Sequence, residues 1–247
     1  MVISIVTFMS RTFHEEERKT NAAKWEEKPE LRKEYAKFYQ RIKAKMIPGP
    51  SLELGSGLCH SKEWIPDMET SEPIEQGNAD SIQSAYHIEK PNESLNNLVA
   101  LDVWHHLEYP QAALQEWQRV LQPGGKVILV EPAMGFLGNL VFTYLHHEKT
   151  GWDKNLRKAD VPIPPNYFTA QSSAHRIFLQ KEIPDALIGW EIEIQRWAAL
   201  SYLATGGYKR SLPGGNFLRK ITSLLETPAN KALPLTACRM LICLTKK

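Results

Sequence analysis

The sequence has 247 residues, in which 30 lysines and arginines stand against 28 aspartates and glutamates, so the formal net charge is only +2. This near balance argues against a polyanionic partner such as a nucleic acid, whose binders need a concentrated positive field. The composition, 43% apolar and 23% charged, is that of a globular protein, and a chain of this length can bury roughly 70–75% of its unfolded surface without a disulfide or metal.

The N-terminal region, residues 1–48, is predicted to form a helical cover. Met1 to Ser10 is apolar but too short to span a bilayer and has no basic leader, so we expect a mobile or docking segment there and no membrane span. Further along, apolar residues recur at helical spacing and predict a helix that packs on a larger body or covers its ligand. The stripe consists of Leu31, Tyr35, Phe38, Tyr39 and Ile42, and Pro48-Gly49-Pro50 ends the helix.

Residues 50–132 show short apolar strands that alternate with helices. Strands are expected at Ser51–Leu54, around Asp67–Ser71, at Asn97–Asp102 and at Lys126–Glu131, with a helix over Pro110–Leu121 that Gln122-Pro123-Gly124-Gly125 stops. Continuous apolar strands joined through helices predict a parallel sheet that is covered on both faces. The expected fold class is therefore α/β, with a doubly wound, mostly parallel sheet in a single domain.

The last 115 residues break this rhythm. Residues 133–184 contain several prolines and a histidine pair, and we expect an insertion or lid above the sheet. Residues 185–247 should supply C-terminal strands and a helix: a strand from Trp190, a helix over Pro213–Glu226 and a final antiparallel strand at Thr236–Lys246. The three cysteines, Cys59, Cys238 and Cys243, form no disulfide framework, which favours reduced thiols and a cytoplasmic location.

A glycine turn follows the first predicted strand in the segment Glu53-Leu54-Gly55-Ser56-Gly57, where we expect the strand to turn into a helix. Glycine suits such a turn because it adopts backbone angles barred to other residues and lets a ligand approach the main chain. Acidic residues end the predicted strands at Glu53, Glu72, Asp102 and Glu131. Glu72 lies 17 positions beyond Gly55, where an acidic side chain typically binds ribose hydroxyls. His60 stands where the dinucleotide fingerprint needs a glycine or alanine, so a nicotinamide cofactor is disfavoured.

Several motifs in this region resemble those of the class I S-adenosylmethionine-dependent methyltransferases. They are ELGSG at Glu53 to Gly57, the acidic strand end Glu72, LDVWHHL at Leu101 to Leu107, RVLQPGG at Arg119 to Gly125 and KVILVEP at Lys126 to Pro132. The resemblance covers about Ser51 to Pro132 and implies a Rossmann-like methyltransferase fold. Leu145–Glu148 and Ser201–Tyr208 also look like segments of a bacterial subgroup of these enzymes.

The resemblance implies S-adenosyl-L-methionine as cofactor and assigns the residues around it. The methionine portion would be held by Glu53, Gly55, Ser56 and Gly57, the ribose by Glu72, the adenine by Ser84 and Ala85, and the floor beneath the sulfonium would be Asp102, Val103 and His105. Two positions depart from the family pattern. Cys59 replaces the third glycine, and Ser84 replaces an acidic residue that often contacts adenine. Both departures put the strength of cofactor binding in question.

Two adjacent histidine pairs are candidates for chemistry at the acceptor. A hydroxyl acceptor needs a base nearby, and histidine is the usual one at neutral pH. His105-His106 follows a core strand, and His146-His147 lies in the insertion. Either pair can act as a base, position the acceptor or simply support the fold. No metal site is expected, because adjacent histidines on one helix, such as His146 and His147 before Glu148, diverge by about 100°.

The sequence thus predicts a methyltransferase that uses S-adenosylmethionine and a small-molecule acceptor, with neither nucleic acid nor membrane as partner. Its acceptor atom and oligomeric state stay open. A non-catalytic methyltransferase-fold module that binds ligands or partners is the main alternative, favoured by Cys59 and Ser84. A nucleotide-sugar or nicotinamide enzyme on the same kind of sheet is a third reading.

Overall fold

The computed structural model describes residues 15–16, 18–75, 77–158, 161–162, 168–209 and 215–247. Seven strands in these ranges form one sheet in the order β3-β2-β1-β4-β5-β7-β6. The strands are β1 (Ser51–Leu54), β2 (Glu69–Glu72), β3 (Ser81–Ile82), β4 (Leu95–Leu101), β5 (Leu121–Pro132), β6 (Trp190–Trp197) and β7 (Arg239–Lys246). Pairing from β3 to β5 is parallel, and β7 runs antiparallel to both of its neighbours. The expected doubly wound sheet with an antiparallel C-terminal strand is confirmed.

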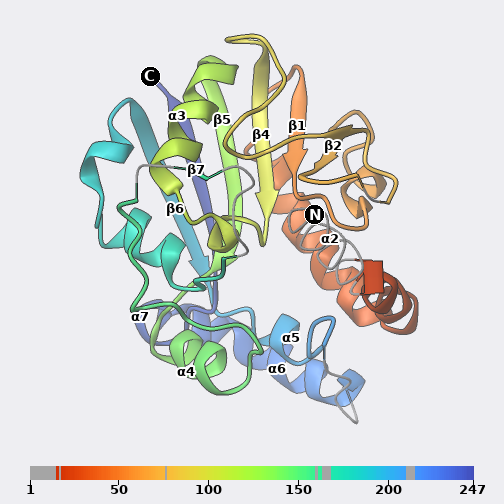
Figure 1. Cartoon of the computed structure of the whole chain (residues 1–247). Helices are drawn as coiled ribbons and strands as arrows, with labels where there is room; N and C mark the ends of the chain where they lie inside the picture. Colours follow the sequence, from red (N-terminus) through yellow and green to blue (C-terminus); the bar gives the residue numbers. More distant parts are fainter. Residues whose placement is uncertain (1–14, 17, 76, 159–160, 163–167, 210–214) are drawn as a thin grey trace, which may run out of the picture.

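Helices surround this sheet and also gather beyond one end of it. After the helical residues 18–27, the α-helices are α2 (Pro29–Lys43), α3 (Pro110–Val120), α4 (Phe136–Tyr144), α5 (Leu200–Leu203), α6 (Gly215–Asn230) and α7 (Leu233–Thr236). Three 3-10 turns are η1 (His60–Glu63), η2 (Trp104–His106) and η4 (Pro184–Leu187), and η3 (His175–Leu179) is a π-helical turn. In Figure 1 the arrows of β1 and β4 point down, toward α4, α5 and α6. The carboxyl ends of the parallel strands therefore face these helices.

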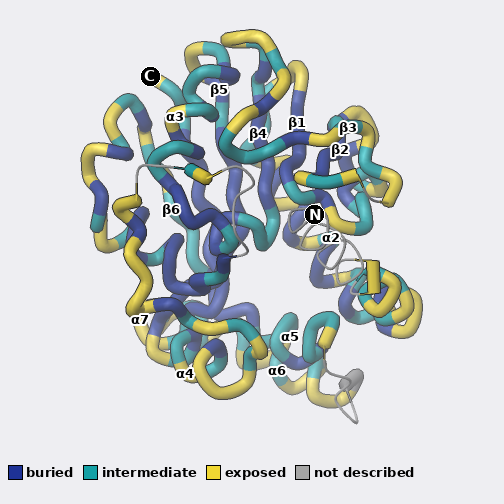
Figure 2. Tube along the Cα trace, viewed as in Figure 1, coloured by how far each residue is buried: buried dark blue, intermediate teal, exposed yellow. Residues whose placement is uncertain are grey.

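The sheet is buried on both faces, and the central strands are dark blue in Figure 2. Alternate residues of β4 enter different hydrophobic clusters: Leu98 packs in the cluster that contains Trp117 of α3, and Val99 in the cluster that contains Phe38 of α2. Because successive side chains of a strand point to opposite faces, one apolar run supplies both clusters. This double burial explains why the central strands are continuously apolar rather than alternating.

Helix α2 confirms the stripe that its sequence predicts. All five stripe residues are buried, and Trp25, which precedes the helix, joins them in the same cluster. Pro29 occupies the first turn, where its missing N–H costs no hydrogen bond, and Arg41 and Lys43 lie in the last turn, where positive charge is favourable. The helix is thus part of the hydrophobic core as well as a cover.

Two local predictions around glycines are wrong. No α-helix follows the glycine turn of β1, because the described residues before β2 form only the single turn η1, preceded by Cys59 in a left-handed conformation (φ 59°). Strand β5 begins at Leu121 instead of Lys126. Leu121 pairs with Leu95 and Lys126 with Asn97, so the segment between them bulges out while the ladder continues on both sides.

Residues 133–184, where an insertion or lid is predicted, contribute to the hydrophobic core. Phe168, Ala170, Ile177 and Phe178 are buried in the same cluster as Trp104. A sequence pattern without regular periodicity concealed this packing.

The C-terminal region keeps the expected strand, helix and strand, with changed bounds. Helix α6 extends to Asn230, the Pro213–Gly214 part of its prediction lies outside the described residues, and β7 begins at Arg239 because α7 occupies the positions before it. Cys59, Cys238 and Cys243 are free thiols, as expected. The predicted docking segment Met1 to Ser10 lies outside the described residues.

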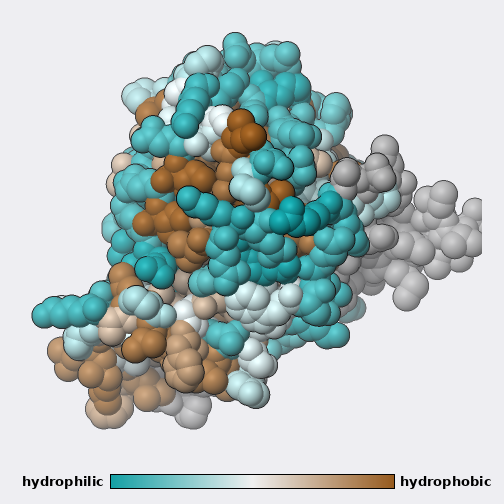
Figure 3. Space-filling view, turned by 90° about the vertical axis from the view of Figure 1, so that its left-hand side faces the viewer, coloured by the Kyte–Doolittle hydropathy of each residue, from teal (hydrophilic) through white to brown (hydrophobic). Residues whose placement is uncertain are grey.

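Apolar side chains also gather on the surface at the lower end of the molecule (Figure 3). Exposed large apolar residues of α4, α6 and α7 are Phe136, Leu140, Tyr144, Phe217, Leu218, Ile221, Leu224, Leu225 and Leu235. No helix among the described residues is both long and apolar enough to cross a membrane. Helix α4 therefore carries apolar residues on its outer side as well as on the side that packs inward.

Replacing Phe38 by alanine tests whether α2 is core. Phe38 is 1% exposed and packs against Trp197 and Arg239, so Phe38→Ala should lower the free energy of unfolding by about 3–5 kcal/mol. Urea denaturation measures this loss. Lys33, an exposed residue of the same helix, is the control, and Lys33→Ala should cost less than about 1 kcal/mol. Equal small effects of both substitutions would mean that α2 is a loosely attached cover.

Candidate functional site

The glycine turn after β1 is shaped by two residues in left-handed conformations, Gly55 (φ 64°) and Gly57 (φ 56°). A Cβ atom at Gly55 would lie 2.6 Å from Cγ2 of Val103, so glycine is needed for the turn and the loop after β4 to pack together. A Cβ at Gly57 would meet nothing within 4 Å. The turn is therefore packed on one side and open on the other.

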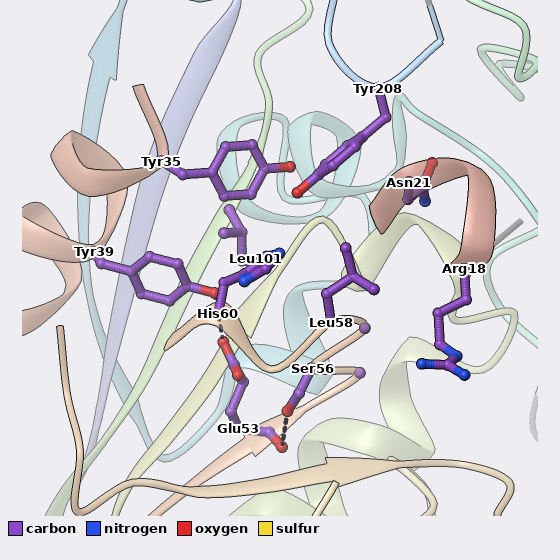
Figure 4. Close-up of a pocket in the computed structure, with 12 residues that line it drawn as sticks. Arg18, Asn21, Tyr35, Tyr39, Glu53, Ser56, Leu58, His60, Leu101 and Tyr208 are labelled. Carbon is purple, nitrogen blue, oxygen red and sulfur yellow. Dashed lines mark hydrogen bonds between the residues drawn. The ribbon is translucent and has the colours of Figure 1, made fainter. Parts of the chain in front are cut away.

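A first cavity of about 190 Å³ opens at this turn (Figure 4). It lies at the carboxyl end of β1, which is next to β4 in the sheet although two strands separate them in the chain. In such sheets, ligands bind at the switch point, which is the place where neighbouring strands of the sheet are not consecutive in the chain. Its lining residues are Arg18, Asn21, Tyr35, Tyr39, Glu53, Gly55, Ser56, Gly57, Leu58, His60, Leu101 and Tyr208. Four of the predicted cofactor residues, Glu53, Gly55, Ser56 and Gly57, are thus brought together.

Glu53 is the buried acid of this cavity. Its carboxylate accepts hydrogen bonds from the Tyr39 hydroxyl (3.0 Å) and the Ser61 hydroxyl (2.5 Å). Burial disfavours the charged form and raises the pKa of Glu53 to about 7, although hydrogen bonds from Ser61, Ser56 and Tyr39 act in the opposite direction. A nearby positive charge would therefore be especially favourable here.

Cys59 and His60 follow the turn, and His60 lines the same cavity. His60 stacks on Trp25 with 3.7 Å between ring centroids, and burial, followed by the charge of Arg32, lowers the pKa of His60 to about 4. Cys59 adopts the left-handed conformation that a glycine would favour, at the position where the family pattern has its third glycine. The departure at Cys59 thus keeps a glycine-like backbone and adds a side chain.

Glu72, at the end of β2, is turned onto the glycine loop. Its Oε1 accepts a short hydrogen bond from the backbone N–H of Gly57. Ser84 and Ala85 lie further along, where the Ser84 hydroxyl accepts from the backbone N–H of Tyr86 (3.2 Å) and the Ala85 carbonyl accepts from the Trp117 indole (3.0 Å). Glu72, Ser84 and Ala85 do not line the first cavity, nor do they line the second cavity that adjoins it.

A second cavity, of about 520 Å³, adjoins the first. The two share Asn21, Tyr35 and Tyr208, and in Figure 4 the hydroxyl groups of Tyr35 and Tyr208 point toward one another. The other residues that line the second cavity are Asp102, His105, His106, Val141, Phe142, Leu145, His146, His147, Glu148, Gln171, Tyr202, Leu203, Gly206, Gly207, Lys209 and Arg239. Both predicted histidine pairs therefore face one cavity.

Asp102 forms a bidentate ion pair with Arg239. The two guanidinium nitrogens lie 2.5 and 2.7 Å from its carboxylate oxygens, and Asp102 has a left-handed backbone (φ 58°). Arg239 is 2% exposed and lies over the rings of Phe38 and Tyr202, with 5.1 Å to each centroid. The pair ties the loop after β4 to the first residue of β7 and to α2.

Glu131, at the end of β5, organises that same loop. The carboxylate is completely buried and accepts hydrogen bonds from the backbone N–H groups of Val103 (2.9 Å) and Trp104 (2.7 Å). Its other oxygen lies 2.7 Å from Nδ1 of His105. One acid thereby orders the turn after β4 and orients His105. Val103, which was predicted as part of the floor beneath the sulfonium, lines neither cavity.

His105 lies between two carboxylates. Its Nδ1 bonds to Glu131, and its Nε2 is 3.5 Å from Oε2 of Glu148. Burial favours the neutral ring, but the two carboxylates outweigh it and raise the pKa of His105 to about 10. Burial alone would raise the pKa of Glu148, yet His105 and the neighbouring histidines lower it to about 2. His105 is accordingly a charged, oriented group at pH 7 rather than a base.

The other histidines have defined ring orientations. The Nδ1–H of His106 donates to the Phe168 carbonyl (3.1 Å), which leaves Nε2 facing Glu148 at 3.7 Å. Nδ1 of His146 accepts from the backbone N–H of Glu148 (3.2 Å). Burial lowers the pKa of both rings, that of His146 to about 4. His146 and His147 lie beyond the end of α4, so the helical divergence assumed for them does not apply.

The sequence did not reveal three residues of the site: Glu148 as a partner of His105, Arg239 and Tyr35. Glu148 was noted only as a neighbour of His146-His147, and Tyr35 only as part of the helical stripe, whereas Tyr208 belongs to the segment Ser201–Tyr208 that resembles the bacterial subgroup. Arg239 begins an apolar strand, where a charged side chain is unusual. A charged residue at the start of an apolar strand was the one feature of the sequence that pointed to the buried pair of Asp102 and Arg239.

Stability should report the ionisation of Glu53. The unfolded chain ionises this carboxyl near pH 4.5 and the folded protein near pH 7, so stability should fall as pH rises between these values. Compared with Glu53→Gln, the wild type should lose about 2–3 kcal/mol of unfolding free energy from about pH 5 to pH 8. Urea titrations at several pH values measure the difference. A pH-independent difference between the two proteins would contradict a buried, protonated Glu53.

Comparisons with known proteins bear on this site. Residues 61–129 match the family model of a methyltransferase domain. No curated protein matches the sequence. A structure of an S-adenosylmethionine-dependent methyltransferase from Archaeoglobus fulgidus has a TM-score of 0.52 with 14% identity, covering 87% of this chain and 94% of that chain. This likeness supports the methyltransferase fold.

Two further solved structures are similar at lower scores. One is an S-adenosylmethionine-dependent methyltransferase from Thermotoga maritima (TM-score 0.48, 17% identity, 85% of this chain and 87% of that chain). The other is a geranyl diphosphate C-methyltransferase from Streptomyces coelicolor (TM-score 0.49, 8% identity, 86% and 81%). The family match from η1 to β5, the glycine turn before it and the sheet agree with the motif resemblance. The match over residues 61–129 and the shared fold support a class I S-adenosylmethionine-dependent methyltransferase family for this chain.

Proposed function

We propose that the chain binds S-adenosylmethionine at the first cavity. It would transfer the methyl group to a polar atom of a small, partly apolar molecule in the second cavity. The observation that carries this proposal is the contact between the two cavities at Asn21, Tyr35 and Tyr208. Methyl transfer requires the acceptor atom, the methyl group and sulfur to lie in line across such a junction.

The residues around the first cavity fit this cofactor. The open side of Gly57 leaves room for a ligand against the main chain, and the buried Glu53 favours a positive charge nearby. The methionine portion would contact the turn from Glu53 to Gly57, and the adenosine would extend toward Glu72, Ser84 and Ala85. Glu72 would then serve both the ribose and the backbone of Gly57.

Asp102 is paired with Arg239, and Glu131 and Glu148 face the charged His105, so Glu53 is the acid that favours a cationic cofactor. Asp102, Val103 and His105 form the proposed floor beneath the sulfonium. S-adenosylmethionine supplies an electrophilic methyl group on a sulfonium ion. The rings of Tyr35 and Tyr208 would exclude water from the junction and keep the acceptor aligned.

The second cavity combines apolar walls with one polar end. Val141, Phe142, Leu145 and Leu203 are apolar, whereas the two histidine pairs and Glu148 are polar. Its volume of about 520 Å³ lies within the range of small-molecule sites, roughly 300–1,000 Å³. With a net charge of +2, a small organic acceptor is favoured over a nucleic acid. We infer that the polar end orients the acceptor atom, for which a hydroxyl oxygen is the best match.

Cofactor binding can be tested by substituting Gly57. Gly57→Ala would place a methyl group in the cavity, so the Kd for S-adenosylmethionine should rise at least about tenfold, which corresponds to ~1.4 kcal/mol. Gly124→Ala is the matched control, because Gly124 also has a positive φ and open space at Cβ but is exposed and remote from both cavities. Isothermal titration calorimetry measures both. Absence of binding to the wild type would refute the proposed function.

Acceptor binding can be separated from cofactor binding at α4. Val141→Trp would fill the second cavity, so formation of S-adenosylhomocysteine with an active acceptor should fall at least about tenfold, while cofactor affinity stays within about twofold. Leu140→Trp, on the exposed side of the helix, should leave turnover unchanged. Assays over a panel of small alcohols, amines and thiols identify the acceptor. Full turnover in Val141→Trp would place the acceptor elsewhere.

A further inference from the structure

Three side chains at the polar end of the second cavity converge in an arrangement that an ion pair alone does not require. Nε2 of His105 is 3.5 Å from one oxygen of Glu148, and Nε2 of His106 is 3.7 Å from the other. One ligand atom from each residue lies within 4.8 Å of the others. Two imidazole nitrogens and a carboxylate are a suitable donor set for a divalent transition metal.

The separations match those around such an ion. Metal–nitrogen and metal–oxygen bonds of roughly 2.0–2.2 Å in a tetrahedron place neighbouring donor atoms about 3.3–3.6 Å apart. The separation of 3.5 Å from His105 to one Glu148 oxygen lies within this range, and that of 3.7 Å from His106 to the other oxygen exceeds it by a tenth of an ångström. An ion would draw together three ligand atoms that already lie within 4.8 Å of one another.

Each of the three residues is also held by a second contact on its far side. Nδ1 of His105 bonds to Glu131 at 2.7 Å, and Nδ1 of His106 donates to the Phe168 carbonyl at 3.1 Å. The side-chain amide of Gln171 donates to Glu148. Histidines that bind metals typically donate their other ring N–H to a carboxylate or carbonyl, which orients the ligating nitrogen. Both histidines have this feature.

Gln171 supplies an independent observation. It is 1% exposed and lines the second cavity, and its amide oxygen has no hydrogen-bond partner among the described residues. A buried amide oxygen without a partner is costly. A water molecule or an acceptor hydroxyl bound to an ion at this place would be a hydrogen-bond donor for the amide oxygen of Gln171.

A neighbouring group of Asp102, His105 and Glu131 is also compact but fits a metal less well. Asp102 is neutralised by its bidentate pair with Arg239. Glu131 already accepts hydrogen bonds from two backbone N–H groups as well as from His105. These acids support the loop, whereas the carboxylate of Glu148 faces the cavity.

We propose that His105, His106 and Glu148 bind a divalent transition metal of the zinc class, with its open coordination position toward the acceptor. The ion replaces the proton on Nε2 of His105, which is released to solvent water. The binding of the metal stands by itself, but its role rests on the proposed function. An acceptor hydroxyl bound to the ion loses its proton to solvent water. The oxygen lone pair then forms the C–O bond to the methyl group, and the C–S pair returns to sulfur, which becomes a neutral thioether.

The test is a metal titration of the full chain. Calorimetry with Zn²⁺ and visible absorption with Co²⁺ should give one ion per chain for the wild type. Glu148→Gln and His106→Ala should each weaken binding at least about tenfold. His87→Ala removes an exposed histidine outside both cavities and should bind as the wild type does. No ion bound by the wild type, or unchanged affinity in both variants, would overturn the proposal.

A second measurement covers the case in which a variant fails to fold. X-ray absorption at the zinc edge of the wild type should show two imidazole ligands and one carboxylate, and a different ligand set would overturn the site. Titration with S-adenosylmethionine is done on the same sample. Metal binding without cofactor binding refutes the proposed function and keeps the site, and the reverse result refutes the site alone. With an acceptor in hand, chelation should abolish turnover and Zn²⁺ should restore it.

Discussion

The buried carboxylate of Glu131 orders the loop on which both cavities depend. It accepts the backbone N–H groups of Val103 and Trp104 and orients His105, so the chain turns sharply just beyond β4. A completely buried acid is tolerated only when its hydrogen-bonding capacity is used, and here it is used by one short segment. Gly55 can pack against that segment only because it lacks a side chain. The shape of the glycine turn therefore depends on the acid two strands away.

A second buried interaction joins this loop to the rest of the molecule. Arg239 begins β7, pairs with Asp102 and packs beneath Phe38 and Tyr202. Removing one partner of a buried pair leaves an uncompensated charge, which typically costs about 3–5 kcal/mol. The pair thus couples the sheet end to α2, which carries Tyr35 of the junction, and to α5, which carries Tyr202 of the second cavity. These helices and the loop after β4 form one packed unit.

The polar end of the second cavity shows how one acid can serve several histidines. Glu148 follows α4 in a segment without regular structure, yet it approaches His105 and His106 from across the cavity. Fixed hydrogen bonds to Glu131 and the Phe168 carbonyl aim both rings at it. The same preorganisation suits either a protonated His105 in an ion pair or a bound cation. The surrounding walls of α4 are apolar, which limits the water that could screen these charges.

The sheet, the glycine turn and the acidic strand ends could be predicted from the sequence, because they depend on short-range patterns of apolar residues and on backbone angles that glycine allows. The same patterns grouped Glu53, Gly55, Ser56 and Gly57 at one site. The packed fold was needed to show that Glu148 meets His105 and His106, that Arg239 neutralises Asp102 from 137 positions away, and that Tyr35 faces Tyr208. The spacing of residues along a chain carries no information on such pairs, because the packing of the whole core brings them together.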